Sequence, residues 1–480
     1  MNKYVKNFFL SAGNTALTLL FPIITFPYVS RILGPSNLGI INFAQSYGYY
    51  FTHIASFGIS SYAIREISKV RDDKEKANKV SNEIFNLNLF FSIISTLLYF
   101  CGVFFVQNFR DNFIVFSIYS VVILTNFLSL DWLLQSYDDY LFSTIRNCII
   151  RILSIIAVFI LIKKPEDYVI YLIITCISEM GTKVSTLFYS KKNYAKLQVR
   201  KKYLNFKDHI KSMFTLFSFR LVNGISANLD KLMIGFMLLY ANVGIYSAGV
   251  KFVLMIQPIV ETVGIVLFPK INISAGVSSE DYQKNLKVNY DMILLLGIPM
   301  AVGMFLVSQR LIPLFAGEQY IDAVPVSRIM SAMIILGPIG DMLGSKTLLV
   351  YKKEKWLLIC SSIVAVSNIV LNFAFIPLWG INGAAAASIL SCAVAVAARY
   401  YFTRKIVNIR LFNKNIIKYS CFTLPFIILY FAFHAQIDSN TVWMFGFVIA
   451  CGIIYFLELL LAKDKLASMV LKKTFGRNII

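Results

Sequence analysis

Residues 213–239, MFTLFSFRLVNGISANLDKLMIGFMLL, decide what kind of fold this chain adopts. The stretch is long and apolar enough to cross a bilayer, which takes about 20 residues of helix. It nevertheless holds Arg220 well inside the apolar run, with Asp230 and Lys231 further along. A cation near the centre of a spanning helix costs about 2.5–3.5 kcal/mol on insertion scales. We therefore expect these side chains to face water, a partner charge or a ligand.

The rest of the chain has the same character. Of its 480 residues, 58% are hydrophobic and only 15% are charged, which predicts an all-α polytopic membrane protein. We count about fourteen candidate transmembrane helices. They cover approximately residues 8–30, 38–62, 84–106, 113–134, 141–162, 168–188, 213–239, 243–268, 290–307, 329–350, 356–378, 384–402, 416–433 and 442–461. The first has a basic start, as a signal peptide would, but continues unbroken and offers no convincing cleavage site, so we interpret it as a helix.

The net charge of +21 is concentrated in alternate loops. Lysine and arginine crowd residues 65–79, 191–211, 404–418 and 463–477, whereas the intervening loops carry few. This is the positive-inside pattern, and it predicts a multi-pass protein with both termini in the cytoplasm. The basic loops would also attract anionic membrane lipids. Nucleic-acid binding is not indicated, because no groove motif combines aromatic and basic residues.

Two bundles and a tail account for the order of the spans. We predict an N-terminal six-helix bundle at residues 1–190, a basic cytoplasmic amphipathic linker at 191–211, a C-terminal six-helix bundle at 212–405, and two additional helices with a basic tail at 406–480. The linker mixes lysines with aromatic residues and leucines, which suggests a helix lying on the inner membrane surface. A weak repeat, NLGI at residues 37–40 and NVGI at 242–245, follows the first span of each half.

The composition argues against enzymatic chemistry. The seven cysteines fall in or beside predicted spans without a CxxC pair, and the three histidines have no metal-ligand spacing. No GxxxxGK[ST] loop is present, so the chain is not expected to hydrolyse ATP. We expect no cofactor and no metal. Uphill transport would need a proton or sodium gradient or a partner protein.

Polar side chains line two early spans. The first carries Asn14 on a face with serine and threonine, and the second carries Gln45 in a stripe of six polar residues at helical spacing. Such stripes either hydrogen-bond between packed helices or line a wet cavity. Two adjacent helices that both have a stripe favour the cavity.

The cations inside the later spans are the main candidates for substrate contacts. Arg220 and Lys231 share one face of their helix, Asn223 flanks it, and Lys251 lies in the next span while Arg31 closes the first. Snorkelling to the membrane surface is the alternative, and it is easiest for Lys231 and Arg31. The acidic candidates for charge pairing or proton coupling are Asp131, Asp230, Glu261 and Asp341. An excess of cations suits an anionic substrate, because arginine offers bidentate geometry to phosphate.

Four segments resemble a known family, the Wzx-type polysaccharide flippases. They are RILGP at 31–35 followed by NLGI at 37–40, GISSYAIREI at 58–67, LDW at 130–132 with Gln135, and LDKLMIG at 229–235 followed by VGIYSA at 243–248. The resemblance extends over essentially the whole chain, including the number of spans. It implies membership of the multidrug/oligosaccharidyl-lipid/polysaccharide exporter (MOP) superfamily and a fold like that of the MATE transporters.

The resemblance also implies a function. The chain would be a flippase of the bacterial inner membrane that moves undecaprenyl-diphosphate-linked oligosaccharide repeat units, for O-antigen, capsule or exopolysaccharide, to the outer leaflet. It would alternate access through a cationic central cavity, where the cations named above would meet the diphosphate. A polysaccharide polymerase and chain-length machinery would be further partners.

Three alternatives stay open. A lipid II flippase would have the same fold and a similar cavity, and only a substrate assay separates the two. A multidrug exporter would be expected to carry a carboxylate in an early helix, and the first two spans contain none. A membrane polysaccharide polymerase would be expected to carry a large outer loop with catalytic arginines, whereas the largest outer loop here, about residues 308–328, is small.

Overall fold

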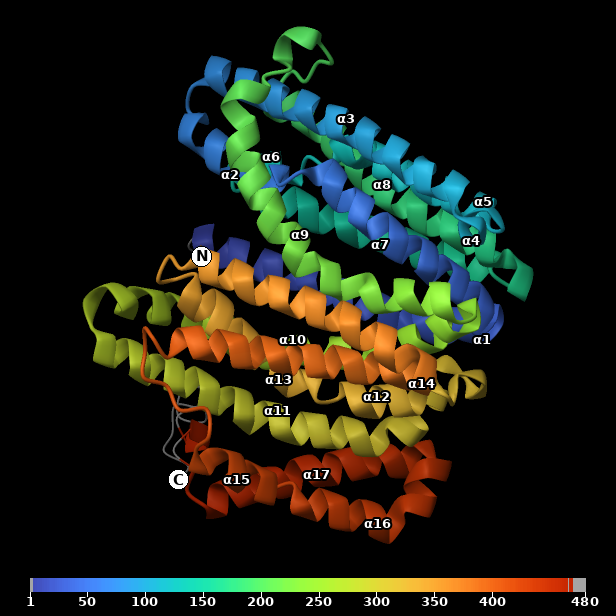
Figure 1. Cartoon of the computed structure of the whole chain (residues 1–480), viewed down its shortest axis with the longest axis vertical. Coiled ribbons are helices and arrows are strands. Elements are labelled where there is room, and N and C mark those ends of the chain that lie inside the picture. The colour runs from blue at the N-terminus through green and yellow to red at the C-terminus, as the bar shows by residue number, and fades with distance from the viewer. Residues whose placement is uncertain (1–2, 465, 469–480) are drawn as a thin grey trace. The chain divides into compact units, whose positions relative to one another are not determined.

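The chain is all-helical in the computed structural model, which describes residues 3–464 and 466–468 (Figure 1). Within these ranges the side chains of residues 3–20, 215–216, 218–227, 263, 265–267, 269–270 and 275–277 are not described. Ten helical segments of the searched part are long and apolar enough to span a membrane. Contacts divide the chain into two compact units, unit 1 (Met1–Gly244) and unit 2 (Ile245–Ile480).

Unit 1 contains nine α-helices and the short 3-10 turns between them. The helices are α1 (Lys3–Ser56), α2 (Ile59–Val70), α3 (Lys74–Phe105), α4 (Gln107–Arg110), α5 (Phe113–Leu124), α6 (Asp131–Ser136), α7 (Tyr140–Leu161), α8 (Tyr168–Asn193) and α9 (Phe206–Met237). The helix α1 is central, because it packs against α3, α5, α7 and α9. Further contacts of the unit join α7 to α8, α2 to α6 and α3, and α5 to α3 and α8.

Unit 2 contains most of α10 and all later helices. They are α10 (Tyr240–Val277), α11 (Ser279–Ala316), α12 (Ala323–Met330), α13 (Met333–Leu343), the π-helical turn η5 (Gly344–Leu348), α14 (Glu354–Thr403), α15 (Lys414–Cys421), α16 (Leu424–Ser439) and α17 (Thr441–Leu461). The helix α11 organises this unit, because it contacts α12 and α13 on one side and α15, α16 and α17 on the other (Figure 1).

Two long helices each contain two of the predicted spans. In α1 the break is at Gly34, with φ 76° and ψ 171°, and in α14 it is at Gly380, with φ 57° and ψ −135°. Positive φ at these positions favours glycine, because a Cβ atom would clash with the backbone. After Gly380 the chain folds back, so that Gly383 packs against the backbone of Phe375. The predicted polytopic helical fold is confirmed.

The two copies of the weak repeat lie against each other within unit 1. A Cβ atom added to Gly39 would stand 1.8 Å from the carbonyl oxygen of Tyr240, and one added to Gly244 would stand 2.1 Å from that of Pro35. Each glycine therefore allows the backbone of the other copy to come close. Small residues have this role wherever transmembrane helices approach closely. How the chain divides into functional bundles stays a prediction.

We predict that Gly39→Ala lowers the thermal stability of the purified protein. The added methyl group overlaps a backbone carbonyl that cannot rotate away, and overpacking of this kind costs about 1–3 kcal/mol. The matched control is Gly446→Ala, because nothing lies within 4 Å of a Cβ atom at Gly446. An equal melting temperature for the two variants would contradict the contact.

The basic linker differs from its prediction, because it is not a helix. After α8 ends at Asn193, the chain is extended from Ala195 to Arg200, and only Lys201–Tyr203 form a 3-10 turn before α9. A ladder of three asparagines on α3 explains this. The side-chain oxygens of Asn78, Asn82 and Asn86 accept the backbone N–H groups of Lys196, Gln198 and Arg200 at 2.8, 2.7 and 3.0 Å.

The asparagine amides also donate to the linker. Asn82 Nδ2 donates to the Lys196 carbonyl at 3.1 Å, and Asn86 Nδ2 to the Gln198 carbonyl at 2.8 Å. The spacing fits because four helical residues rise about 6 Å and two extended residues about 6.6 Å. The helix thus binds the linker much as a neighbouring strand would. A surface helix would have to give up these bonds.

Both ends of the linker are held by further polar contacts. The Tyr194 hydroxyl donates to Asp139 Oδ2 at 2.6 Å, and burial together with this carboxylate raises the pKa of Tyr194. Beyond the ladder, the ring of His209 lies between Tyr62 and Glu83. The distances are 2.7 Å from Nδ1 to the tyrosine hydroxyl and 3.1 Å from Nε2 to the carboxylate. The connection between α8 and α9 is therefore fixed along its length.

We predict that Asn82→Leu makes the linker sensitive to trypsin. The variant removes one acceptor and one donor of the ladder, so the segment with Lys196 and Arg200 should open more often. Asn193→Leu is the control, because the side chain of this exposed asparagine donates to the Tyr189 carbonyl of its own helix at 2.9 Å. The rate of cleavage between residues 191 and 202 is the measurement, and unchanged rates in both variants would contradict the ladder.

Candidate functional site

A polar face runs along α7 in unit 1. The exposed isoleucines of this helix recur at 145, 149, 152, 156 and 160, which is one helical stripe. Asn147 and Arg151 lie on the opposite side of the helix, four residues apart. The guanidinium carbon of Arg151 is 5.9 Å from the centre of the Phe21 ring on α1. The apolar stripe suits lipid, so the arginine points away from it.

The neighbouring helix α8 repeats this arrangement. Its exposed apolar residues include Ile170, Ile173 and Ile177, and Glu179 lies on the other side of the helix. Although it is opposite the apolar stripe, Glu179 is exposed, which indicates a water-accessible face. Lys183 follows one turn later and donates to the carbonyl of Val122 at 2.9 Å. Residues four apart on a helix are neighbours, so the two charges can interact.

These charges are deep in the predicted bilayer. Arg151 follows the first residue of α7 by eleven positions, and Glu179 follows that of α8 by eleven, which is about 16 Å along each helix. An apolar core about 30 Å thick places both near its middle. Ionisable groups at this depth are expensive, and they usually mark a substrate or ion pathway.

Arg146 anchors the same face from within the protein. The residue is 6% exposed, and its Nη2 pairs with Asp131 Oδ1 at 3.0 Å, while the Asp131 side chain is 47% exposed. Arg146 also donates to Thr186 Oγ1 on α8 and, at 2.9 and 3.1 Å, to Asn147 Oδ1. One guanidinium therefore ties α6, α7 and α8 together and leaves a carboxylate partly open to solvent.

The structure places the predicted residues of unit 1 as follows. Arg31 is exposed, Gln45 is half-buried on α1, and Asp230 is buried. Lys231 is half-buried, and its Nζ donates to Asn228 Oδ1 at 3.4 Å. The side chains of Asn14, Arg220 and Asn223 lie outside the described residues, so their predicted roles stay predictions.

In unit 2 the predicted residues are on two different helices. Lys251 is half-buried on α10, and on the same helix Glu261 accepts a hydrogen bond from Gln257 at 2.7 Å. Asp341 on α13 pairs with Lys346 Nζ at 2.9 Å. Asp131 and Asp341 thus pair with Arg146 and Lys346, two cations that the candidate set did not include.

Sequence reasoning missed five cations of the spans, namely Arg146, Arg151, Lys183, Lys346 and Arg399. A signal for Arg151 was available, because it lies opposite the isoleucine stripe of its own span. For Lys346 the carboxylate of Asp341, five residues earlier in the same apolar run, was a local signal, whereas its burial depends on how α10, α11 and α13 pack. Among the described residues, no group of three histidine, cysteine, aspartate or glutamate side chains could hold a metal ion.

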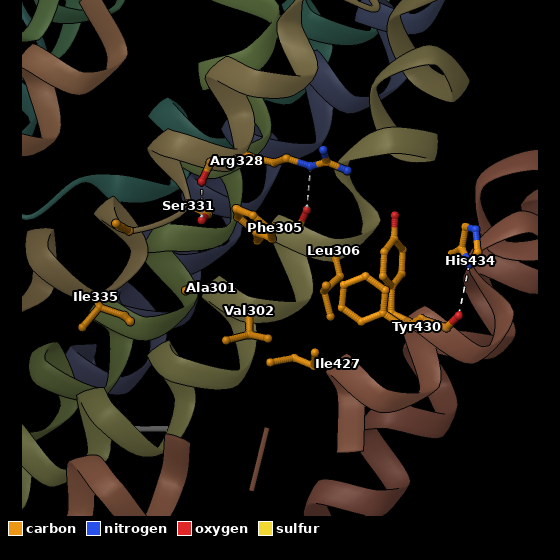
Figure 2. Close-up of a pocket in the computed structure, with 12 residues that line it drawn as sticks. Ala301, Val302, Phe305, Leu306, Arg328, Ser331, Ile335, Ile427, Tyr430 and His434 are labelled. Carbon is orange, nitrogen blue, oxygen red and sulfur yellow. Dashed lines mark hydrogen bonds between the residues drawn. The ribbon is translucent and has the colours of Figure 1, made fainter. Parts of the chain in front are cut away.

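An apolar cavity of about 700 Å³ lies between α11, α12, α13 and α16 of unit 2 (Figure 2). Figure 2 shows Val302, Phe305 and Leu306 on one wall and Ile427 and Tyr430 on the other. The one strongly basic side chain of its lining is Arg328. The Nε atom of this residue donates to the Phe305 carbonyl at 3.3 Å, and its guanidinium lies 5.6 Å from the centre of the Phe305 ring. The cavity therefore combines apolar walls with a cation at one end.

Comparison with solved structures identifies the class. The fold is similar to that of a lipid II flippase, MurJ in an inward closed conformation, with a TM-score of 0.76 and 17% identity over 98% of this chain and 100% of that one. It is also similar to a MATE multidrug transporter of the MOP superfamily in an inward-facing conformation, with a TM-score of 0.62 and 13% identity over 81% and 94% of the two chains. The chain is thus a polytopic membrane protein with a MurJ- and MATE-like transporter fold.

The family follows from the sequence. A family profile described as "Polysaccharide biosynthesis protein" matches residues 4–273, more than half of the chain, so the chain belongs to this family. A relative from Escherichia coli strain K12, named as a proposed O-antigen transporter, is 20% identical over 337 residues, which are 70% of this chain and 81% of the relative. The family is one of transporters and not of enzymes, and the predicted resemblance is confirmed.

We predict that Arg146→Ala destabilises unit 1. The variant removes the hydrogen bond to the buried Thr186 hydroxyl and the cation that pairs with the half-exposed carboxylate of Asp131. Hydrogen bonds that involve a charged group contribute about 1.5–3 kcal/mol, so we expect a measurable loss of stability. Arg146→Lys should recover only part of the loss, because an ammonium lacks the planar fork that reaches several acceptors. Lys191→Ala, at an exposed position near the end of α8, is the control.

Thermal unfolding of the three purified variants is the measurement. The expected order of melting temperatures is Lys191→Ala highest, Arg146→Lys intermediate and Arg146→Ala lowest. An Arg146→Ala variant as stable as the Lys191→Ala control would show that the guanidinium does not hold these helices together.

Proposed function

We propose that the chain is a flippase that moves undecaprenyl-diphosphate-linked oligosaccharide repeat units from the inner to the outer leaflet of a bacterial cytoplasmic membrane, for the synthesis of a surface polysaccharide. The observation that carries the proposal is the charged face of α7 and α8. It brings Arg151 near mid-bilayer depth and Lys183 one helical turn beyond Glu179, on the side of these helices opposite their exposed isoleucines. An anionic headgroup crossing the membrane needs such cations on its path.

Arginine and lysine contribute differently to the proposed contact. The planar guanidinium of Arg151 can bind two phosphate oxygens at once, and the ammonium of Lys183 adds a point charge. Arg220, Lys251, Arg31 and Lys231 would extend the cationic path, and Asn14, Gln45 and Asn223 would meet the sugar hydroxyls. Exposure of this surface first to one side of the membrane and then to the other would complete the translocation.

The apolar cavity at Phe305 and Tyr430 fits the other end of such a substrate. Its walls suit an isoprenoid chain, and Arg328 gives it one cation near the end of the apolar surface. The relative named as a proposed O-antigen transporter supports a lipid-linked repeat unit as the substrate. Both termini would lie in the cytoplasm, as the basic loops predict.

A lipid II flippase is the second candidate, because the similarity to MurJ extends over 98% of this chain. Both substrates would present a diphosphate and a polyprenyl tail, so the cationic face does not separate them. The two candidates differ in the consequence of losing the protein, since only lipid II transport is needed for the cell wall.

A deletion strain tests the proposal. We expect loss of the surface polysaccharide and accumulation of its lipid-linked repeat units in the inner leaflet, with normal growth. Arrested growth with accumulated lipid II would establish the second candidate instead. An unchanged surface glycan with no accumulated intermediate would contradict both.

We predict that Arg151→Ala and Lys183→Ala, introduced together, fail to restore the surface polysaccharide in the deletion strain. Removal of both cations takes two positive charges from the path of the crossing diphosphate, so we expect at least a tenfold loss, equivalent to about 1.4 kcal/mol. Lys191→Ala and Lys192→Ala together form the control, because both lysines are exposed beyond the apolar part of α8. Full restoration by the first variant, at equal membrane levels, would contradict the role of this face.

A further inference from the structure

Unit 2 buries an ammonium group in an irregular turn. Lys346 is 4% exposed and belongs to η5, the π-helical turn that follows α13. Its Nζ pairs with Asp341 Oδ2 at 2.9 Å, and the turn is fixed by the Tyr282 hydroxyl, which donates to the Lys346 carbonyl at 2.6 Å. Single π-helical turns within α-helices frequently occur at functional sites, because they re-aim the side chains of one turn.

The buried side-chain amide of Asn289 lies close to the ammonium of Lys346. Asn289 on α11 is 0% exposed, and neither its Oδ1 nor its Nδ2 has a hydrogen-bond partner among the described residues. A Cβ atom added to Gly264 on α10 would lie 2.0 Å from Lys346 Nζ and 3.3 Å from Asn289 Oδ1. The ammonium and the amide oxygen therefore meet around the bare backbone of Gly264.

Two further charged residues near this site, Arg399 and Glu261, have partners of their own. Arg399 on α14 donates from Nη1 to the carbonyl of Gly340 at 2.9 Å, so it is engaged by the helix end. Glu261, one turn before Gly264 on α10, is engaged by Gln257. Asp341 Oδ2 accepts from the ammonium of Lys346, and Asn289 Oδ1 lies nearby without bonding to it.

The carboxylate of Asp341 and the amide oxygen of Asn289 are of the kind that binds monovalent cations in transporters. A carboxylate, an amide oxygen and backbone carbonyls beside an irregular helical turn are the donors that hold sodium ions or protons in membrane bundles. We propose that these groups form a monovalent-cation site of unit 2 whose cation is the ammonium of Lys346 itself. The protein thus carries a tethered ion where a free sodium ion would otherwise bind.

Two consequences follow from a tethered cation. The native protein needs no sodium ion at this site, since the ammonium of Lys346 already fills the position. Removal of the ammonium leaves Asp341 with no counter-charge and opens a space beside Asn289, so the shortened variant should bind sodium. An ion pair with a purely structural role would be weakened by the same change and gain no response to sodium.

Thermal unfolding of the full-length protein in detergent tests the site. Choline chloride is replaced stepwise by sodium chloride at constant ionic strength. We expect no shift for the wild type and a saturable rise in melting temperature for Lys346→Ala, on the order of 2–4 °C. Lys352→Ala is the matched control, because this nearby lysine is exposed, and it should behave as the wild type.

Further variants separate the site from a general effect of sodium. Asp341→Asn added to Lys346→Ala should abolish the rise, and Lys346→Met should show none, because its side chain fills the space without a charge. Lys346→Ser is the second cavity variant, in case the alanine variant does not fold. Absence of a sodium response in both cavity variants, a response that survives Asp341→Asn, or a sodium-dependent rise in the wild type would each overturn the proposal.

Discussion

The free energy of a charge in a bilayer is the constraint on which the arrangement of this chain depends. Arg146, Lys183, Lys346 and Arg399 lie in apolar spans, and each has an oxygen acceptor. The acceptor is on another helix for Arg146, Lys183 and Arg399, and for Lys346 it is Asp341, five residues earlier in the chain. The acceptors are two carboxylates and two backbone carbonyls. Without them, each cation would cost several kcal/mol in hydrocarbon, so these pairings determine which helices can neighbour each other.

The same constraint explains why the cations of unit 1 gather on one side. Isoleucines cover the faces of α7 and α8 that suit lipid, and Arg151, Glu179 and Lys183 are on the others. Arg146 then joins the two helices through Asp131 and Thr186, which fixes the direction of the charged face. A transporter of an anionic lipid needs a surface of this kind that is rigid before the substrate arrives, because ordering long side chains during transport would cost free energy.

Much of the fold could be predicted from the sequence, because the rules of membrane insertion act locally. The length of the apolar runs and the alternation of basic loops predicted the helical polytopic fold, and four short motifs carried the resemblance to the polysaccharide flippases. The pairing of the charges could not be predicted in this way. Asp131 and Asp341 were recognised as candidates, but the partner of Asp131, Arg146, lies on another helix, and the burial of Lys346 beside Asp341 depends on how α10, α11 and α13 pack.

The conformation of the linker likewise could not be predicted from its sequence. Its composition resembles that of a surface helix, and local propensity alone would make it one. The asparagines at 78, 82 and 86 override that preference by supplying the hydrogen bonds of an extended strand. Their spacing of four was visible in the sequence, but it gives no indication of which segment they bind. Hydrogen bonds to the asparagines of α3 determine the conformation of this segment, and only the structure shows them.

The most direct test of the account is translocation by the purified protein. Proteoliposomes that contain an undecaprenyl-diphosphate-linked oligosaccharide in their inner leaflet would be exposed to a membrane-impermeant glycosidase. The account predicts that the protein makes the inner-leaflet glycan accessible to the enzyme, and that the variant without Arg151 and Lys183 does so at least ten times more slowly. Digestion of the inner-leaflet glycan no faster than in protein-free liposomes would contradict the account.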